Sequence, residues 1–156
     1  MRWGRGCGGS AAGAPVPPAV TIGGRASRTD APAYAAYFGD MAGTVYAIDA
    51  ATGELLWRRR VDEHQITRIT GAPTLYQDRL YVPVSSLEEA SGGNPTYECC
   101  TFRGSVAALD VADGRVLWKT FAIDEPKPIG KSADGVEIWC ASAAAISSAP
   151  TIDVKR

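Results

Sequence analysis

The sequence lacks both an excess of charge of either sign and any long apolar run. Sixteen basic residues stand against 17 acidic residues, for a net charge of −1. A near-balanced charge argues against nucleic acid as a partner. No apolar stretch approaches the roughly 18 residues that a membrane-spanning helix needs. Residues 1–24 also lack the apolar segment of a secretory signal, so we interpret residues 1–33 as a disordered leader or a misassigned start.

Histidine and spaced cysteines are also scarce, which argues against several metal and haem sites. His64 is the only histidine, and no Cys-x-x-Cys motif precedes it, so a haem c attachment site is absent from this sequence. Neither Cys7 nor Cys140 has the spacing of a zinc ligand. We interpret His64 as a solvated loop residue, Cys140 as a small packing residue and Cys7 as incidental.

An internal repeat is the strongest positive feature of the sequence. Residues 43–57 and 104–118 match at an offset of 61 positions. Each copy alternates small and apolar residues, turns at an Asp-x-x-Thr/Asp-Gly sequence, and ends in Trp57 or Trp118. The glycine permits a positive φ in a tight hairpin, and the aspartate can accept hydrogen bonds from the turn's own amides. Each copy therefore predicts a β-hairpin.

A weaker repeat relates residues 71–75 to residues 148–152 and completes the predicted strand pattern. We expect one full four-stranded unit, three strands of a preceding unit, and the first strand of a third unit at 148–152; the seven other strands are placed at 34–38, 44–49, 55–60, 69–75, 79–85, 105–110 and 115–121. Four-stranded antiparallel units with one tryptophan per repeat are typical of β-propeller blades.

The predicted fold is therefore all-β, a partial β-propeller of about two blades over residues 34–156, with blade boundaries near 62 and 123. A propeller closes with roughly four to eight blades, so we expect missing blades or another copy to complete the ring. The long connections 86–103 and 123–147 fall on the same face. Because long loops in compact domains are usually functional or disordered, we expect that face to carry the site.

The repeat resembles the tryptophan-docking motif of the pyrroloquinoline quinone (PQQ) dependent dehydrogenases. The first copy reads Ala-x-Asp-x-x-Thr-Gly-x-x-x-Trp over residues 47–57, and the second, over residues 108–118, has Asp113 in place of the threonine. The resemblance implies that tryptophan and alanine stack across neighbouring blades, as a flat apolar ring can. Non-enzymatic propellers that act as protein-binding scaffolds use similar repeats, and they remain the alternative.

The adjacent cysteines in the long loop add a more specific likeness. In quinoprotein alcohol dehydrogenases a disulfide between neighbouring cysteines packs on one face of the quinone, and a nearby arginine reaches its oxygens. Cys99, Cys100 and Arg103 match that arrangement, and residues 71–106 look most similar to the polyvinyl alcohol dehydrogenases. The resemblance thus implies PQQ binding by these three residues. The alternative is two thiols that are adjacent by chance, or that pair with Cys7 and Cys140.

The resemblance also implies a reaction. We expect alcohol groups, those of polyvinyl alcohol or similar secondary alcohols, to be oxidised to ketones. The complete protein would use PQQ and a bound calcium as cofactors. It would pass its electrons to an acceptor such as a cytochrome, in the periplasm or outside the cell. No motif here matches the family's calcium ligands or catalytic aspartate, so neither is assigned. Glu88 and Glu89 could point at a site from the long loop, but an acidic pair is usually a solvated face, and residues 58–60 are likewise interpreted as surface charges.

Overall fold

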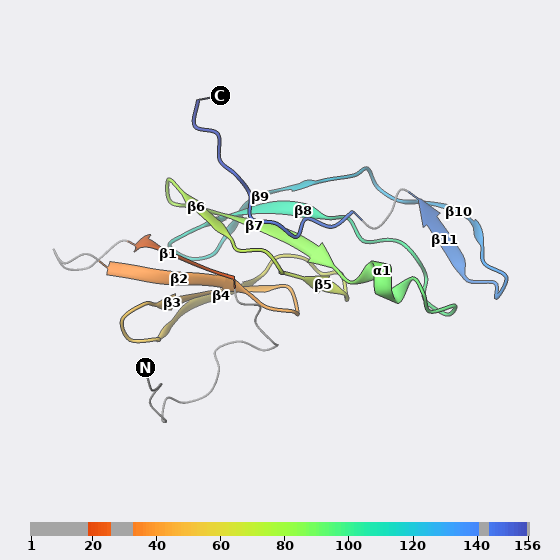
Figure 1. The fold of residues 1–156 in the computed structure, drawn as a ribbon, viewed down its shortest axis with the longest axis horizontal. Coiled ribbons are helices and arrows are strands. Elements are labelled where there is room, and N and C mark those ends of the chain that lie inside the picture. The colour runs from red at the N-terminus through yellow and green to blue at the C-terminus, as the bar shows by residue number, and fades with distance from the viewer. Residues whose placement is uncertain (1–18, 26–32, 141–143, 156) are drawn as a thin grey trace.

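A computed structural model describes residues 19–25, 33–140 and 144–155 of the chain. Two antiparallel sheets lie face to face, and the connections at one end carry a short helix and a separate hairpin (Figure 1). The expected all-β fold of a partial propeller is confirmed, with one sheet of four strands and one of five.

The first sheet contains four strands that pair in chain order. They are β1 (Val20–Arg25), β2 (Ala33–Gly39), β3 (Thr44–Asp49) and β4 (Leu55–Arg60). Strand β1 lies inside the segment interpreted as a leader, so that interpretation is wrong for residues 20–25; residues 1–18 and 26–32 lie outside the described residues. The strand forms because it pairs with the free edge of β2, from Val20 opposite Phe38 to Arg25 opposite Ala33. That partner could not be identified from local sequence.

The second sheet contains β5 (Thr67–Arg68), β6 (Thr74–Tyr76), β7 (Arg79–Ser86), β8 (Ser105–Asp110) and β9 (Val116–Phe121). Both β5 and β6 pair with β7, so the single strand predicted at 69–75 is interrupted. At the interruption the chain passes so close to Ser147 that a Cβ on Gly71 would lie 2.7 Å from the Ser147 carbonyl oxygen. The strand expected at 148–152 is also absent, although the Thr74 hydroxyl donates to the Pro150 carbonyl at 2.6 Å.

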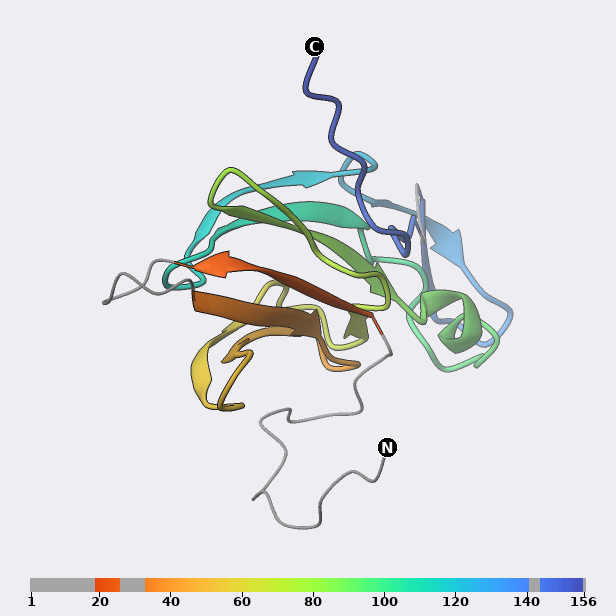
Figure 2. The same cartoon turned by 60° about the vertical axis from the view of Figure 1, so that its left-hand side comes forward.

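The core lies between the two sheets, which are seen as stacked layers in Figure 2. Alternate residues of β2, β3, β7 and β8 face inward, as the period of two in a strand requires. The inward side chains are fully buried and make one apolar cluster, which includes Ala35, Tyr37, Val45 and Ala47 from the first sheet and Leu80, Val82, Val84, Ala107 and Leu109 from the second. Each sheet thus buries one face against the other.

Trp57 links the two sheets through a hydrogen bond and a contact with a turn glycine, whereas stacking on the repeat alanine stays a prediction. Its Nε1 donates to the Val111 carbonyl oxygen at 2.9 Å, and its ring lies against Gly114 in the turn before β9. A Cβ on Gly114 would lie 2.5 Å from an indole carbon. Trp118 holds the same position in the second copy and is 42% exposed.

The long connections contribute the remaining elements. The connection after β7 holds α1 (Glu88–Ser91), and the connection after β9 holds the hairpin of β10 (Lys127–Lys131) and β11 (Glu137–Cys140). The two views place α1 and the hairpin at the same end of the sheets (Figures 1 and 2). In the part of the chain that the structure describes, no helix has the length and apolar character needed to cross a membrane.

Candidate functional site

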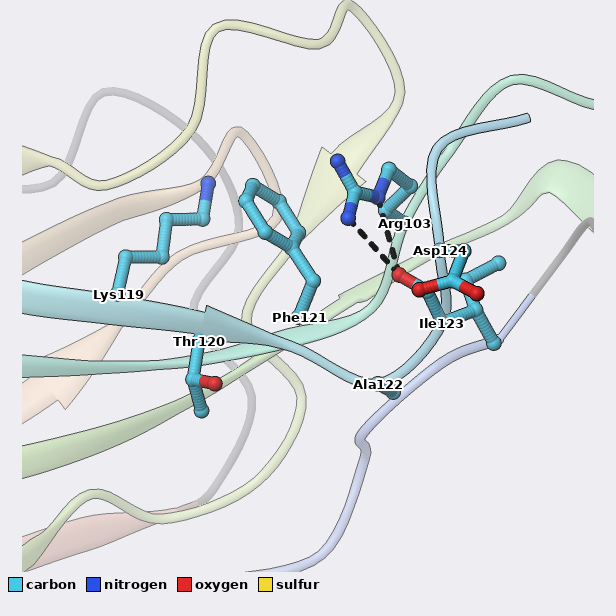
Figure 3. A pocket seen from close by; sticks show the side chains of 7 residues that line it. All are labelled: Arg103, Lys119, Thr120, Phe121, Ala122, Ile123 and Asp124. Carbon is cyan, nitrogen blue, oxygen red and sulfur yellow. Dashed lines mark hydrogen bonds between the residues drawn. The ribbon is translucent and has the colours of Figure 1, made fainter. Parts of the chain in front are cut away.

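Arg103 lies just before β8 and is held by the segment that follows β9. Its Nε and one terminal nitrogen donate to the Ile123 carbonyl oxygen at 3.2 and 2.9 Å, and the guanidinium carbon lies 3.9 Å from the centroid of the Phe121 ring. These residues, together with Lys119 and Asp124, line a shallow hollow of about 550 Å³ (Figure 3). Arg103 therefore presents a fixed, partly buried cation to this hollow.

Cys99 and Cys100 are joined to each other by a disulfide across a cis peptide bond. Both residues are partly buried. The alternative pairing with Cys140 is not seen, because Cys140 is exposed and has a free thiol. Cys140 is thus not the packing residue that we expected, and Cys7 lies outside the described residues.

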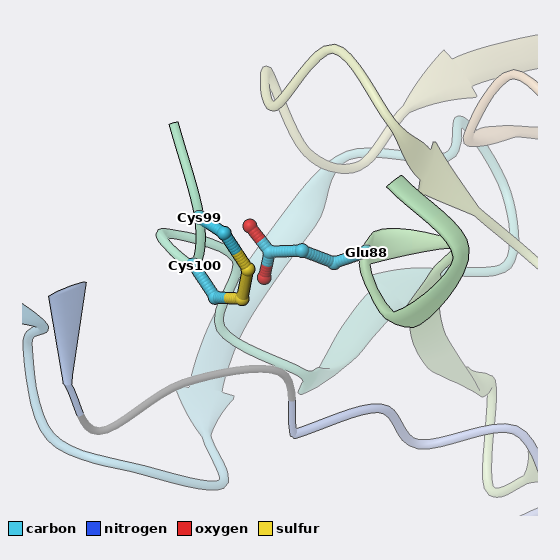
Figure 4. A group of neighbouring side chains, drawn as sticks. All are labelled: Glu88, Cys99 and Cys100. Atoms are coloured by element: carbon cyan, nitrogen blue, oxygen red, sulfur yellow. A yellow bond between two sulfur atoms is a disulfide. The ribbon is translucent and has the colours of Figure 1, made fainter. Parts of the chain in front are cut away.

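The carboxylate of Glu88 lies beside the disulfide, as Figure 4 shows. Glu88 is 1% exposed, and it accepts hydrogen bonds from the backbone N–H of Thr101 at 2.7 Å and of Phe102 at 3.0 Å. The Tyr97 hydroxyl donates to it at 3.1 Å. The interpretation of Glu88 as a surface charge is therefore wrong, whereas Glu89 is exposed as expected. The reason is that the loop folds its amides onto one carboxylate, which local sequence does not signal.

The pKa of Tyr97 reflects the burial and the negative charge of this cluster. Burial, and after it the charge and hydrogen bond of Glu88, raises the pKa of Tyr97 to about 12. The phenol is therefore protonated at every physiological pH and acts as a permanent donor to the carboxylate. Glu98 adds to the same effect from the adjacent position.

His64 approaches the cysteine loop from the connection after the first sheet. Its Nε2 lies 3.0 Å from the Thr101 hydroxyl, and its ring packs edge-on against Phe102 with the centroids 5.4 Å apart. His64 is partly buried, so the interpretation as a solvated loop residue is wrong. Its contacts span 37 positions of sequence, and no local pattern predicts them.

The hairpin of β10 and β11 contacts the other side of the cysteine loop. The Trp139 backbone N–H donates to the Cys99 carbonyl at 2.8 Å, and its indole Nε1 donates to Glu98 at 2.7 Å. Cys99 and Ile138 lie opposite each other in a parallel bridge. Cys99 also lines a second hollow, of about 280 Å³, between its loop and the hairpin. The two long connections therefore meet at the cysteines, as their placement on one face predicts.

The described geometry fits one face of a flat cofactor in part. The partly buried disulfide can serve as a polarizable platform, and Arg103 supplies fixed donors. However, Cys99 and Arg103 line different hollows in this structure. Oxygen and sulfur atoms of Glu88, Cys99 and Cys100 lie within 4.8 Å of one another, but sulfurs that are bonded to each other offer no thiolate to a metal ion.

Comparison with known proteins places this geometry in a family. The PQQ_2 profile, described as outer membrane protein assembly factor BamB, matches residues 20–133, which is more than half of the chain. The chain belongs to this family. Its match begins at β1 and includes both tryptophan-docking repeats, the cysteine pair and Arg103.

Among curated proteins, the chain is 44% identical over 124 residues to a polyvinylalcohol dehydrogenase of Pseudomonas sp, covering 79% of this chain and 19% of the relative. It is 41% identical over 123 residues to the polyvinylalcohol dehydrogenase of Sphingopyxis sp. (strain 113P3), covering 78% and 19%. Among solved structures, the quinohemoprotein alcohol dehydrogenase from Comamonas testosteroni matches with 27% identity and a TM-score of 0.46, over 57% of this chain and 12% of that one. The chain thus spans about a fifth of the length of the curated relatives.

Proposed function

We propose that this chain forms part of a PQQ-dependent dehydrogenase that oxidises alcohol groups to ketones, with polyvinyl alcohol or similar secondary alcohols as substrates. The observation that carries the proposal is the Cys99–Cys100 disulfide on the long-loop face of two docking repeats. The identity of 44% and 41% to two polyvinylalcohol dehydrogenases supports this choice within a family that also contains an assembly factor.

Each proposed site residue has a distinct role. The disulfide of Cys99 and Cys100 supplies a flat platform on which one face of PQQ rests. Arg103 retains one terminal nitrogen without a hydrogen-bond partner among the described residues, and that group is suited to a carboxylate or quinone oxygen. When bound, PQQ supplies the two-electron chemistry, and the protein orients it. Calcium and the catalytic base are assigned to no residue of this chain.

The substrate is an alcohol, and the reduced cofactor passes its electrons to an acceptor such as a cytochrome. A structural disulfide persists in oxidising compartments, so we place the protein in the periplasm or outside the cell. Further blades, from the same or another chain, complete the ring.

A cofactor titration tests the proposed site. The variant Cys99→Ser/Cys100→Ser should bind PQQ about tenfold more weakly than the wild type, equivalent to ~1.4 kcal/mol of lost stacking on the platform. The variant Cys140→Ser is the matched control, because its thiol is exposed and free. Alkylation without reductant, followed by mass mapping of residues 96–103, establishes the oxidation state beforehand. Unchanged PQQ affinity in the double variant would contradict the role of the pair.

The alternative is a scaffold propeller that binds proteins and no cofactor. The matching family is described as an outer membrane protein assembly factor, which supports this alternative. If the protein is a scaffold, PQQ should quench the tryptophan fluorescence of neither the wild type nor the double variant. The variant Arg103→Lys should then give the same titration curve as the wild type. Saturable PQQ binding that weakens in Arg103→Lys, but not in the exposed control Arg58→Lys, excludes the scaffold.

A further inference from the structure

We infer that Glu88 is a positioning residue that fixes the loop around Cys99 and Cys100 and keeps the pair oxidised. The hydrogen-bond donors to Glu88 lie on both sides of the cysteine pair in the sequence. Tyr97 lies two positions before the cysteines, and Thr101 and Phe102 follow them directly. All three donate to the one buried carboxylate, so Glu88 ties both ends of the cysteine pair to α1.

The three hydrogen-bond donors around Glu88 favour an ionised carboxylate. Two backbone N–H groups and one hydroxyl point at the carboxylate, and an ionised carboxylate is the acceptor-only group that such an arrangement satisfies. Tyr97 remains a donor because its pKa is raised to about 12. Within the described part of the chain, no lysine, arginine or histidine forms an ion pair with Glu88. Its negative charge therefore stays unneutralised beside the sulfurs.

That charge acts differently on the two oxidation states of the pair. The disulfide is neutral, whereas the reduced pair ionises to a thiolate. A carboxylate oxygen of Glu88 lies within 4.8 Å of both Sγ atoms, so it raises the pKa of the reduced thiols and disfavours their ionisation. Reduction by dithiothreitol breaks the S–S bond and forms two S–H bonds, and the reductant closes into its own cyclic disulfide. Glu88 opposes this exchange.

The test measures the redox equilibrium of the pair in dithiothreitol buffers of fixed ratio. Samples are quenched with iodoacetamide, and the peptide of residues 96–103 is quantified by mass. Glu88→Gln keeps the shape of the side chain and removes its charge. At about pH 8 to 9, where thiolates form, this variant should move the equilibrium about tenfold toward the dithiol, equivalent to about 30 mV. Glu89→Gln, at the adjacent exposed position, should stay within about twofold of the wild type.

The pH profile separates charge from a merely structural role. The difference in redox equilibrium between Glu88→Gln and the wild type, called the offset below, should shrink toward about pH 6, where both thiols are neutral in every variant. A loosened loop gives an offset that does not depend on pH. Tyr97→Phe removes one hydrogen bond and leaves the charge, so its profile should run parallel to that of the wild type.

Three results would overturn the inference: no offset in Glu88→Gln, an offset independent of pH, or a Tyr97→Phe profile that diverges as that of Glu88→Gln does. If Glu88→Gln fails to fold, Glu88→Asp replaces it. Its shorter side chain draws the charge away from the sulfurs, so a shift toward the dithiol that grows with pH is expected, and the absence of such a shift would overturn the inference. No readout involves PQQ, so failure here is distinct from failure of the proposed function.

Discussion

Lys119 on β9 forms an ion pair with Asp62, which follows β4. Only 21% of the Lys119 side chain and 10% of the Asp62 side chain are exposed, and the lysine also donates to the Val61 carbonyl at 3.2 Å. Burial tends to raise the pKa of Asp62, but the hydrogen bonds from Lys119 and the His64 amide outweigh it and lower that pKa. The pair therefore joins the connection after the first sheet to the last strand of the second.

Replacing Lys119 by methionine should reduce the free energy of unfolding by about 2 kcal/mol at neutral pH, because Asp62 is left mostly buried without its cation. The loss should shrink as the pH falls below the ordinary aspartate value of 3.8, since a carboxyl whose folded pKa is lowered stabilises only while it is ionised. Urea unfolding at several pH values measures both effects. The control Glu63→Gln, whose side chain is 93% exposed, should cost less than about 0.5 kcal/mol.

The two repeat tryptophans should differ in their contribution to stability. Trp57→Ala removes a ring that packs against Gly114 and a hydrogen bond to Val111, so we expect a loss of about 3 kcal/mol. Trp118→Ala is the matched control in the second copy, and its indole is 42% exposed. Urea unfolding should show a clearly smaller loss for Trp118→Ala. Equal losses would contradict the docking interpretation.

The glycines of the two repeat turns allow the docking contact to be measured apart from backbone strain. Gly53 and Gly114 have φ values of +76° and +69°, so alanine at either position costs about 1 kcal/mol. Only at Gly114 would the new Cβ meet Trp57, at 2.5 Å, and this overlap should add about 1–3 kcal/mol. Thermal unfolding of Gly53→Ala and Gly114→Ala compares the two. A difference of zero would show that the indole moves aside freely.

Asp49 should give the fold an acid-sensitive component. The Thr52 amide first, and then Arg25, lower the pKa of Asp49 from 3.8 to about 2. Because the folded pKa is lowered, the stabilisation is fully present above 3.8 and is lost as the pH falls through 2. Between these values the unfolded chain binds more protons, so wild-type stability should fall on acidification more steeply than that of Asp49→Asn. Asp134→Asn, an exposed control, should follow the wild type.

Much of the fold could be predicted because its signals are local. The repeat places β3 (Thr44–Asp49), β4 (Leu55–Arg60) and β8 (Ser105–Asp110) at the residues expected, since aspartate and glycine define each turn. Strand β1 escaped prediction because its six residues become a strand only by pairing with β2, and residues rich in glycine and proline surround them.

The candidate site was predictable only in part, for the same reason. Adjacent cysteines are visible in any sequence, so Cys99 and Cys100 could be singled out. Glu88 could not, because a glutamate in a polar loop is most often solvated, and only the folded positions of two amides make it a buried acceptor. His64 likewise gains its role from Thr101, which lies far away in sequence.

The contact between Trp57 and Gly114 has a direction. The Trp57 indole of one blade packs against the Gly114 turn of the next. The two contacting surfaces therefore differ, and the interface is heterologous. Repeating such an interface adds every unit in the same sense, and the result is a closed ring or an open filament according to the rotation per step. By the same logic the exposed Trp118 is positioned to dock on a further blade. The turn at Gly53 is positioned to accept the indole of another blade, since a Cβ on Gly53 would meet no described atom within 4 Å. The same pair of blades thus carries complementary, head-to-tail ends.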